Sequence, residues 1–80
     1  MPKIAGNEQY YKEVQIEMDR TGLPSKDAEV SMLYRTISTM RIQEKKSFAE
    51  IRQFFHDTWG LSMGAFYTRL NWVRQKYVCP

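Results

Sequence analysis

The sequence predicts an all-α fold, a small four-helix domain with short loops. Apolar residues recur at spacings of three and four along most of the chain, which is the period of a helix with one buried face. Gly and Pro are sparse, with four and three residues, and Gly22, Pro24 and Gly60 lie where helices are expected to end. No Asn-Gly or Asp-Gly hairpin turn occurs. Eighty residues are enough for one domain, residues 1–80, with a small core.

The N-terminal half holds two predicted helices, over about residues 8–20 and 26–45. Asn7 is a suitable N-cap for the first helix, and Gly22 is a suitable end. Ser25 is the expected N-cap of the second helix. The expected buried stripes are Tyr10, Tyr11, Val14 and Met18 in the first helix, and Val30, Leu33, Ile37 and Met40 in the second.

Two more helices are predicted over about residues 47–77, and they would form a helix-turn-helix. Ser47 and Glu50 have the S-x-x-E spacing of a capping box, directly before an apolar run. Gly60 is expected to end the third helix, and Ser62 to cap the fourth. The residues expected to face inward are Ile51, Phe54 and Phe55 in the third helix, and Phe66, Leu70, Val73 and Tyr77 in the fourth.

Charge is distributed unevenly along the chain. Residues 1–30 hold four Lys/Arg and six Asp/Glu, a net charge of −2, whereas residues 31–80 hold eight and three, a net charge of +5. The basic half predicts an anionic partner, although a solvated helical surface can carry the same charge. The acidic half is expected to face away from that partner, towards a second protein.

The outer side of the fourth helix predicts contacts with DNA. It carries Met63, Gly64, Tyr67, Thr68, Asn71, Arg74 and Gln75, with no acid. A carboxamide such as that of Asn71 can pair with adenine, and hydroxyls can reach base edges. The expected phosphate contacts are the helix N-terminus at Ser47 and the cations Arg52, Arg69, Arg74 and Lys76.

The segments SFAEI (residues 47–51) and GLSMGAFYTRLNWVRQKY (residues 60–77) resemble the helix-turn-helix in the C-terminal DNA-binding region of sigma factors and of similar response-regulator domains. The resemblance implies a DNA-binding module rather than a sigma factor. It places groove-facing side chains at Ser62, Met63, Gly64, Tyr67, Thr68 and Asn71. The stretch HDTW (residues 56–59) adds about one turn to that motif, in the first helix or in the turn.

The sequence gives little support for enzyme or metal chemistry, so we expect no cofactor. It has one His, His56, beside Asp57, and one Cys, Cys79. A zinc site needs three or four ligands, so His56 is expected to be exposed or capping, and Cys79 to be a free thiol.

Trp59 is expected in the core, whereas Trp72 either packs on another helix or lies in a partner interface.

The expected function is sequence-specific DNA binding by a small transcriptional regulator, possibly of a plasmid or phage. A homodimer is expected, because one such motif contacts few base pairs, and Val30 to Met40 would suit either a dimer seam or core packing. There are two alternatives. One is a protein-interaction module, such as an adaptor or inhibitor, without DNA binding, and the other is an accessory DNA-binding protein of plasmid transfer or replication.

No signal peptide or apolar run of about 20 residues is present, so we expect a soluble, cytoplasmic protein and no membrane partner.

Overall fold

The computed structural model describes residues 7–77, and it confirms an all-α domain of four helices with no strand in that range. The helices are α1 (Asn7–Thr21), α2 (Ser25–Ser38), α3 (Phe48–Trp59) and α4 (Met63–Lys76), and a π-helical turn, η1 (Thr39–Gln43), continues α2. The predictions for the side chain of Asn7 and for Cys79 fall outside what the structure describes.

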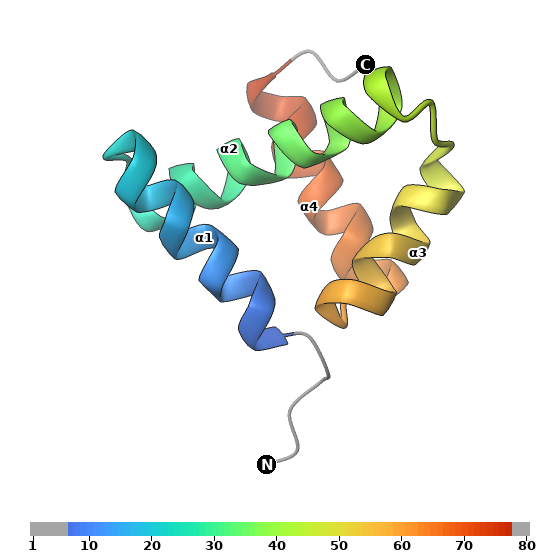
Figure 1. The fold of residues 1–80 in the computed structure, drawn as a ribbon, viewed down its shortest axis with the longest axis horizontal. Helices are drawn as coiled ribbons and strands as arrows, with labels where there is room; N and C mark the ends of the chain where they lie inside the picture. The colour runs from blue at the N-terminus through green and yellow to red at the C-terminus, as the bar shows by residue number, and fades with distance from the viewer. Residues whose placement is uncertain (1–6, 78–80) are drawn as a thin grey trace.

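The four helices pack around one core. α1 packs on α2 and on α3, α2 also packs on α4, and α3 packs on α4. Figure 1 shows α2 crossing α4, while α3 runs beside α4 and joins it through a short turn. The buried apolar residues come from all four helices, from η1 and from this turn, and they are Tyr10, Val14, Ala28, Val30, Met32, Leu33, Ile37, Met40, Ile51, Phe55, Trp59, Leu61, Phe66, Leu70 and Val73.

The predicted apolar stripes are largely confirmed, with one clear error in α1. Tyr10 is fully buried, but the neighbouring Tyr11 is 56% exposed. Successive residues on a helix are 100° apart, so two adjacent side chains rarely share the centre of one buried face. Trp59 is buried in the core as predicted, and Trp72 packs at the core's edge with the ammonium group of Lys26 on α2 over its ring.

The turn between α1 and α2 corrects the predicted cap. Gly22 ends α1 at φ +75°, and its N–H donates to the carbonyl oxygen of Met18 at 2.8 Å. The N-cap of α2 is Pro24 rather than Ser25, and no side chain caps that end. Proline fixes φ near the value found here, −59°, so the chain enters α2 one residue earlier than predicted.

The end of the second predicted helix also differs. We expected one helix to about residue 45, but regular α-helix stops at Ser38 and widens into η1, where the Glu44 N–H donates to the Thr39 carbonyl oxygen at 3.1 Å. The Lys46 N–H then donates to the carbonyl oxygen of Met40 at 2.8 Å, with Lys45 at φ +55°. A left-handed residue ends the helix and redirects the chain into α3.

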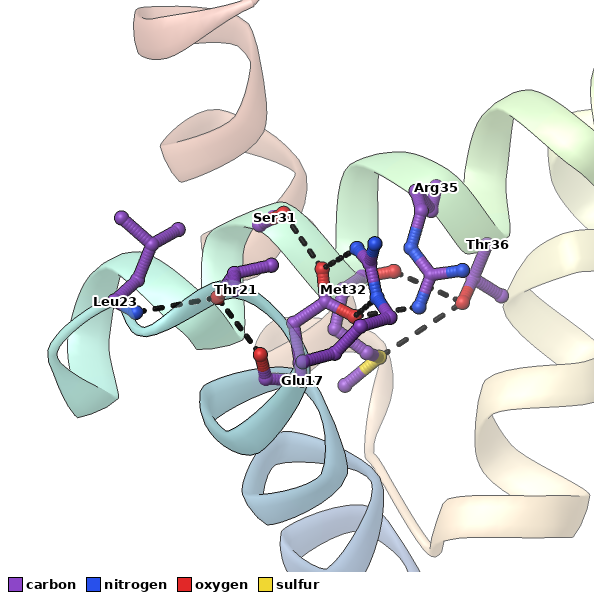
Figure 2. A network of polar contacts seen from close by, with 8 residues as sticks. Glu17, Thr21, Leu23, Ser31, Met32, Arg35 and Thr36 are labelled. Atoms are coloured by element: carbon purple, nitrogen blue, oxygen red, sulfur yellow. Dashed lines mark hydrogen bonds and ion pairs between the residues drawn. The ribbon is translucent and has the colours of Figure 1, made fainter.

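A buried carboxylate joins α1 to α2. Glu17 of α1 has no exposed side-chain surface, and it accepts hydrogen bonds from Arg20, Arg35 and Ser31. Figure 2 shows the side chains of Ser31 and Arg35 reaching Glu17 from α2. Burial alone would raise the pKa of Glu17, but the hydrogen bonds outweigh it and lower the pKa to about 2. Glu17 is therefore a charged, fully partnered link between the two helices.

Candidate nucleic-acid interface

The α3–turn–α4 unit has the local structure that the sequence predicts. The Glu50 N–H donates to the Ser47 hydroxyl oxygen at 3.2 Å, and the Ser47 N–H donates to the Glu50 carboxylate at 3.0 Å, so the capping box is confirmed. Gly60 ends α3 at φ +67°, and the Ser62 hydroxyl oxygen accepts from the Ala65 N–H at 3.2 Å at the start of α4.

The turn itself is short. Three residues, 60–62, separate Trp59 from Met63, which is the length of connection found in helix-turn-helix units. The additional residues HDTW (56–59) all belong to α3. They lengthen α3 and form no part of the turn between α3 and α4.

One face of α4 is open to solvent. Met63, Tyr67, Asn71 and Arg74 follow one another at spacings of four, four and three, so they form one line along the helix, here called the α4 stripe. All four are exposed, with Met63 at 58% and Tyr67 at 46%. The other predicted members of this face are also exposed, namely Ser62, Gly64, Thr68 and Gln75. The helix contains no acid. The structure therefore confirms that this face of α4 is exposed and carries no negative charge.

Arg52 of α3 lies directly beside the α4 stripe. Its Nη1 donates to the Tyr67 hydroxyl oxygen at 3.3 Å. Arg52 also lines an open groove with His56, Leu61 and Met63, between α3 and the start of α4. No ion pair is recorded for Arg52 within residues 7–77, so its positive charge is available at the edge of the stripe.

Arg69 is the one predicted phosphate contact that the structure turns inward. Its side chain is only 16% exposed, and its Nε lies 3.6 Å from the carboxylate of Glu29 and 3.1 Å from the hydroxyl of Tyr10. The sequence did carry a signal for this, because Arg69 is three residues after Phe66 and four before Val73, both on the buried stripe. The expectation that Arg69 borders the exposed face is therefore wrong.

Two other predicted phosphate contacts are already occupied within the molecule. The Nζ of Lys76 lies 3.2 Å from the carboxylate of Asp27, with both side chains about half exposed at 45% and 47%. The capping box uses the hydroxyl and the N–H of Ser47, and it places the carboxylate of Glu50 at the same helix end. A negative charge there disfavours a phosphate, so the helix end at Ser47 is a poorer anion site than expected.

The acids of the C-terminal half lie away from the α4 stripe. Glu50 and Asp57 line a groove on another side of α3, with Met40 and Lys46. A hydrogen bond from His56 and then one from Gln53 lower the pKa of Asp57, so this acid stays charged. Glu44 lines a separate pocket between η1 and α1. No acid of residues 31–77 lies on α4, although Asp57 contacts His56 and Gln53, which line the groove that contains Arg52 and Met63.

The acids of the N-terminal half are largely engaged inside the domain. Glu17 is paired with Arg20 and Arg35, and Glu29 and Asp27 face Arg69 and Lys76 of α4. Two more acids on α1, Glu13 and Asp19, accept hydrogen bonds from glutamines one turn away. Much of the negative charge that predicted a second protein partner thus holds the helices together.

Three further observations bear on other kinds of site. Within residues 7–77, His, Cys, Asp and Glu form no group of three or more that would hold a metal ion. His56 is exposed beside Asp57, as predicted, with Nδ1 3.3 Å from the carboxylate. No helix in the described range has the length and apolar character needed to cross a membrane.

Comparisons with protein-family models, curated proteins and solved structures give no match for this chain. The sigma-factor and response-regulator resemblance therefore stays a hypothesis about residues 47–76. The class that the fold defines is an all-α, four-helix domain whose last two helices are joined by a tight three-residue turn.

Proposed function

We propose that this protein binds double-stranded DNA sequence-specifically, with α4 in the major groove and α3 across the phosphate backbone. One observation carries the proposal. The exposed stripe of α4 holds hydrogen-bonding side chains and the cation Arg74, and Arg52 of α3 lies beside it. Within residues 7–77 neither arginine forms an ion pair, and α4 contains no acid. The major groove of DNA admits a helix whose side chains form hydrogen bonds with base edges.

Residues in the first three turns of α4 suit base contacts. Asn71 offers an exposed carboxamide of the kind that pairs with adenine, and the hydroxyl of Thr68 is exposed nearby. A side chain at Gly64 would meet nothing within 4 Å, so this position faces open space and lets the backbone approach a ligand. The first turn of α4 has no acid, which leaves the positive end of its helix dipole uncompensated.

Arg52 and Tyr67 would act at the phosphate backbone and the groove edge. Because Arg52 donates to the Tyr67 hydroxyl oxygen, the phenol proton is free to be donated outward. Such a proton suits an acceptor on a phosphate or a base. Phosphate contacts of this kind supply affinity and orientation, whereas base contacts supply specificity.

The biological role that suits such a module is a small transcriptional regulator. A homodimer would double the number of base pairs contacted and give the site two-fold symmetry. An accessory role in DNA transfer or replication would use the same surface. A protein-interaction module without DNA binding has less support, because Asp27 and Glu29 are engaged in ion pairs within the domain.

The test is selection of a preferred site from a pool of random-sequence DNA duplexes, followed by binding measurements at several salt concentrations. Enrichment of one motif, with an affinity that falls linearly on a log–log plot against salt, would support the proposal. A two-fold symmetric motif would support the dimer. A folded helical sample that neither enriches a motif nor retards any duplex would overturn the proposal and favour a protein partner.

A further inference from the structure

Two arginines from different elements meet on one aromatic ring near the end of α4. The Cζ of Arg41, in η1, lies 4.5 Å from the ring centroid of Phe48, and the Cζ of Arg74, in α4, lies 5.8 Å from the same centroid. Both distances are within the range of a cation–π interaction. These three residues are here called the Phe48 cluster.

The two arginines are held in place without an acid. The Nη1 of Arg41 donates to the carbonyl oxygen of Lys46 at 3.0 Å, while its Nε is buried and has no hydrogen-bond partner. Arg74 is exposed, and its recorded contact is with the Phe48 ring. No ion pair involves either arginine within the described residues. Two positive charges that share one ring repel each other, and an anion bound between or beside them would relieve that repulsion.

The carboxylate closest in sequence does not fill that role. Glu50 is two residues from Phe48, but it accepts a hydrogen bond from the Ser47 N–H and lines the groove that contains Met40 and Asp57. The hydrogen bond from the Ser47 N–H is the main cause that lowers the pKa of Glu50. The Glu50 carboxylate is therefore charged and bound at the N-terminus of α3. Within residues 7–77, the Phe48 cluster is thus a positively charged site with no carboxylate at ion-pair distance.

We propose that the Phe48 cluster binds a phosphate of the DNA backbone, an assignment that rests on the proposed function. Arg74 is the last member of the α4 stripe, so a helix lying in the major groove would bring the cluster to the groove's edge. Guanidinium groups suit phosphate because they present several N–H donors in one plane. The Phe48 ring fixes both groups before binding, which reduces the entropy lost on contact. Arg41 of η1 would then bind the same phosphate as Arg74 of α4, although the two residues are far apart in the sequence.

The test compares Arg41→Gln and Arg74→Gln with Lys12→Gln in the full chain. Lys12 is an exposed cation on α1 that forms no ion pair within residues 7–77, so its substitution removes the same charge away from the α4 stripe. Binding to a random-sequence duplex is measured over a series of salt concentrations. Arg41→Gln and Arg74→Gln are each expected to weaken binding about tenfold and to make the log–log salt slope less steep, with the two changes together at about 0.9, the value for one phosphate. Lys12→Gln is expected to change neither.

Two further variants separate charge from folding. Arg41→Lys keeps the charge and is expected to keep the salt slope, even if it loses the hydrogen bond to Lys46. Phe48→Leu keeps an apolar side chain without a ring face, and it is expected to weaken binding while the slope stays the same. A melting curve for each variant identifies loss of fold.

Each outcome has a distinct meaning. If Arg41→Gln and Lys12→Gln have equal effects while the natural sequence binds DNA, the assignment of the Phe48 cluster is overturned and the proposed function stands. If the natural sequence binds no duplex at any salt concentration, the proposed function falls, and this assignment falls with it.

Discussion

The Nε–H of Arg69 donates a hydrogen bond to the hydroxyl oxygen of Tyr10 at 3.1 Å, across 59 positions of the sequence. The Tyr10 hydroxyl in turn donates to the carboxylate of Glu29. Burial, and then the carboxylate of Glu29, raise the pKa of Tyr10, so its hydroxyl keeps the proton that it donates. One guanidinium group on α4 therefore contacts side chains of both α1 and α2, and Arg69 belongs to the core's edge rather than to the DNA-facing surface.

We predict that Arg69→Gln mainly lowers the stability of the fold, whereas Arg52→Gln mainly changes the salt dependence of DNA binding. Arg69→Gln is expected to lower the free energy of unfolding by about 1.5–3 kcal/mol, as for other hydrogen bonds to charged groups, without altering the salt slope of DNA binding. Arg52→Gln is expected to change stability by less than about 0.5 kcal/mol and to make the slope less steep by about 0.9. Urea unfolding and binding titrations measure both. A stable Arg69→Gln variant with a reduced slope would mean that Arg69 reaches a phosphate.

The second prediction concerns Glu17 and acid. Glu17→Gln is expected to lower the free energy of unfolding near neutral pH by about 1.5–3 kcal/mol, because it removes the charge that Arg20 and Arg35 surround. The folded-state pKa of about 2 is below the ordinary value of 4.5. The unfolded chain therefore binds more protons between those values, and the stabilisation from Glu17 is complete above pH 4.5 and is lost as the pH falls towards 2.

Urea unfolding of the natural sequence and Glu17→Gln, near pH 7 and near pH 3, measures this dependence. The difference in stability between the two proteins is expected to shrink at the lower pH. An equal difference at both pH values would show that the carboxylate's charge is not the source of the stabilisation. Comparing the two proteins at each pH cancels the titration of the other acids, such as Glu50 and Asp57.

Much of the α3–α4 unit was predictable because its determinants are local. The capping box of Ser47 and Glu50 is a spacing of three residues, and the glycine at residue 60 is the residue that most readily adopts φ +67°. The buried Phe66, Leu70 and Val73 recur at the helical period. The remaining residues of α4, on the opposite side of the helix, are therefore predicted to be exposed.

What the sequence did not predict depends on contacts between distant residues. Arg69 turns inward because Tyr10 and Glu29, on two other helices, form hydrogen bonds or ion pairs with it. Glu17 is buried because Ser31 and Arg35 reach it from α2, and a charged residue on its own predicts exposure. The Phe48 cluster joins η1 to α4. The sequence predicted Arg74 as a phosphate contact, but for Arg41 it gave only a general excess of positive charge in residues 31–80.

The third prediction concerns Lys45, the non-glycine residue at positive φ within the described part of the chain, with φ +55°. Lys45→Gly is expected to raise the free energy of unfolding by about 0.5–1 kcal/mol, because glycine adopts this conformation without steric cost. Lys45→Ala serves as the control, and it is expected to give no gain because it retains the Cβ. Thermal unfolding of the three proteins compares them. A less stable glycine variant would mean that the lysine side chain makes a stabilising interaction.

The fourth prediction concerns Asn71, whose carboxamide is exposed on the α4 stripe. Asn71→Ala is expected to weaken binding to the selected duplex by about 1–3 kcal/mol, the discrimination that one bidentate base contact provides. Binding to a random duplex of the same length should fall much less, because that binding depends on phosphates. Thermal stability should change by less than about 0.5 kcal/mol, since Asn71 is not part of the core.

Gln15→Ala is the matched control for Asn71→Ala. It removes an exposed carboxamide from α1, where the side chain donates to Asp19 at 3.1 Å, and it is expected to leave both affinities unchanged. Titrations of the selected and random duplexes, at one salt concentration, compare the three proteins. Equal losses on both duplexes for Asn71→Ala would mean that Asn71 contributes to general affinity and that another residue of the α4 stripe recognises the bases. A loss confined to the selected duplex would assign Asn71 to base recognition, because a phosphate contact would weaken binding to every sequence alike.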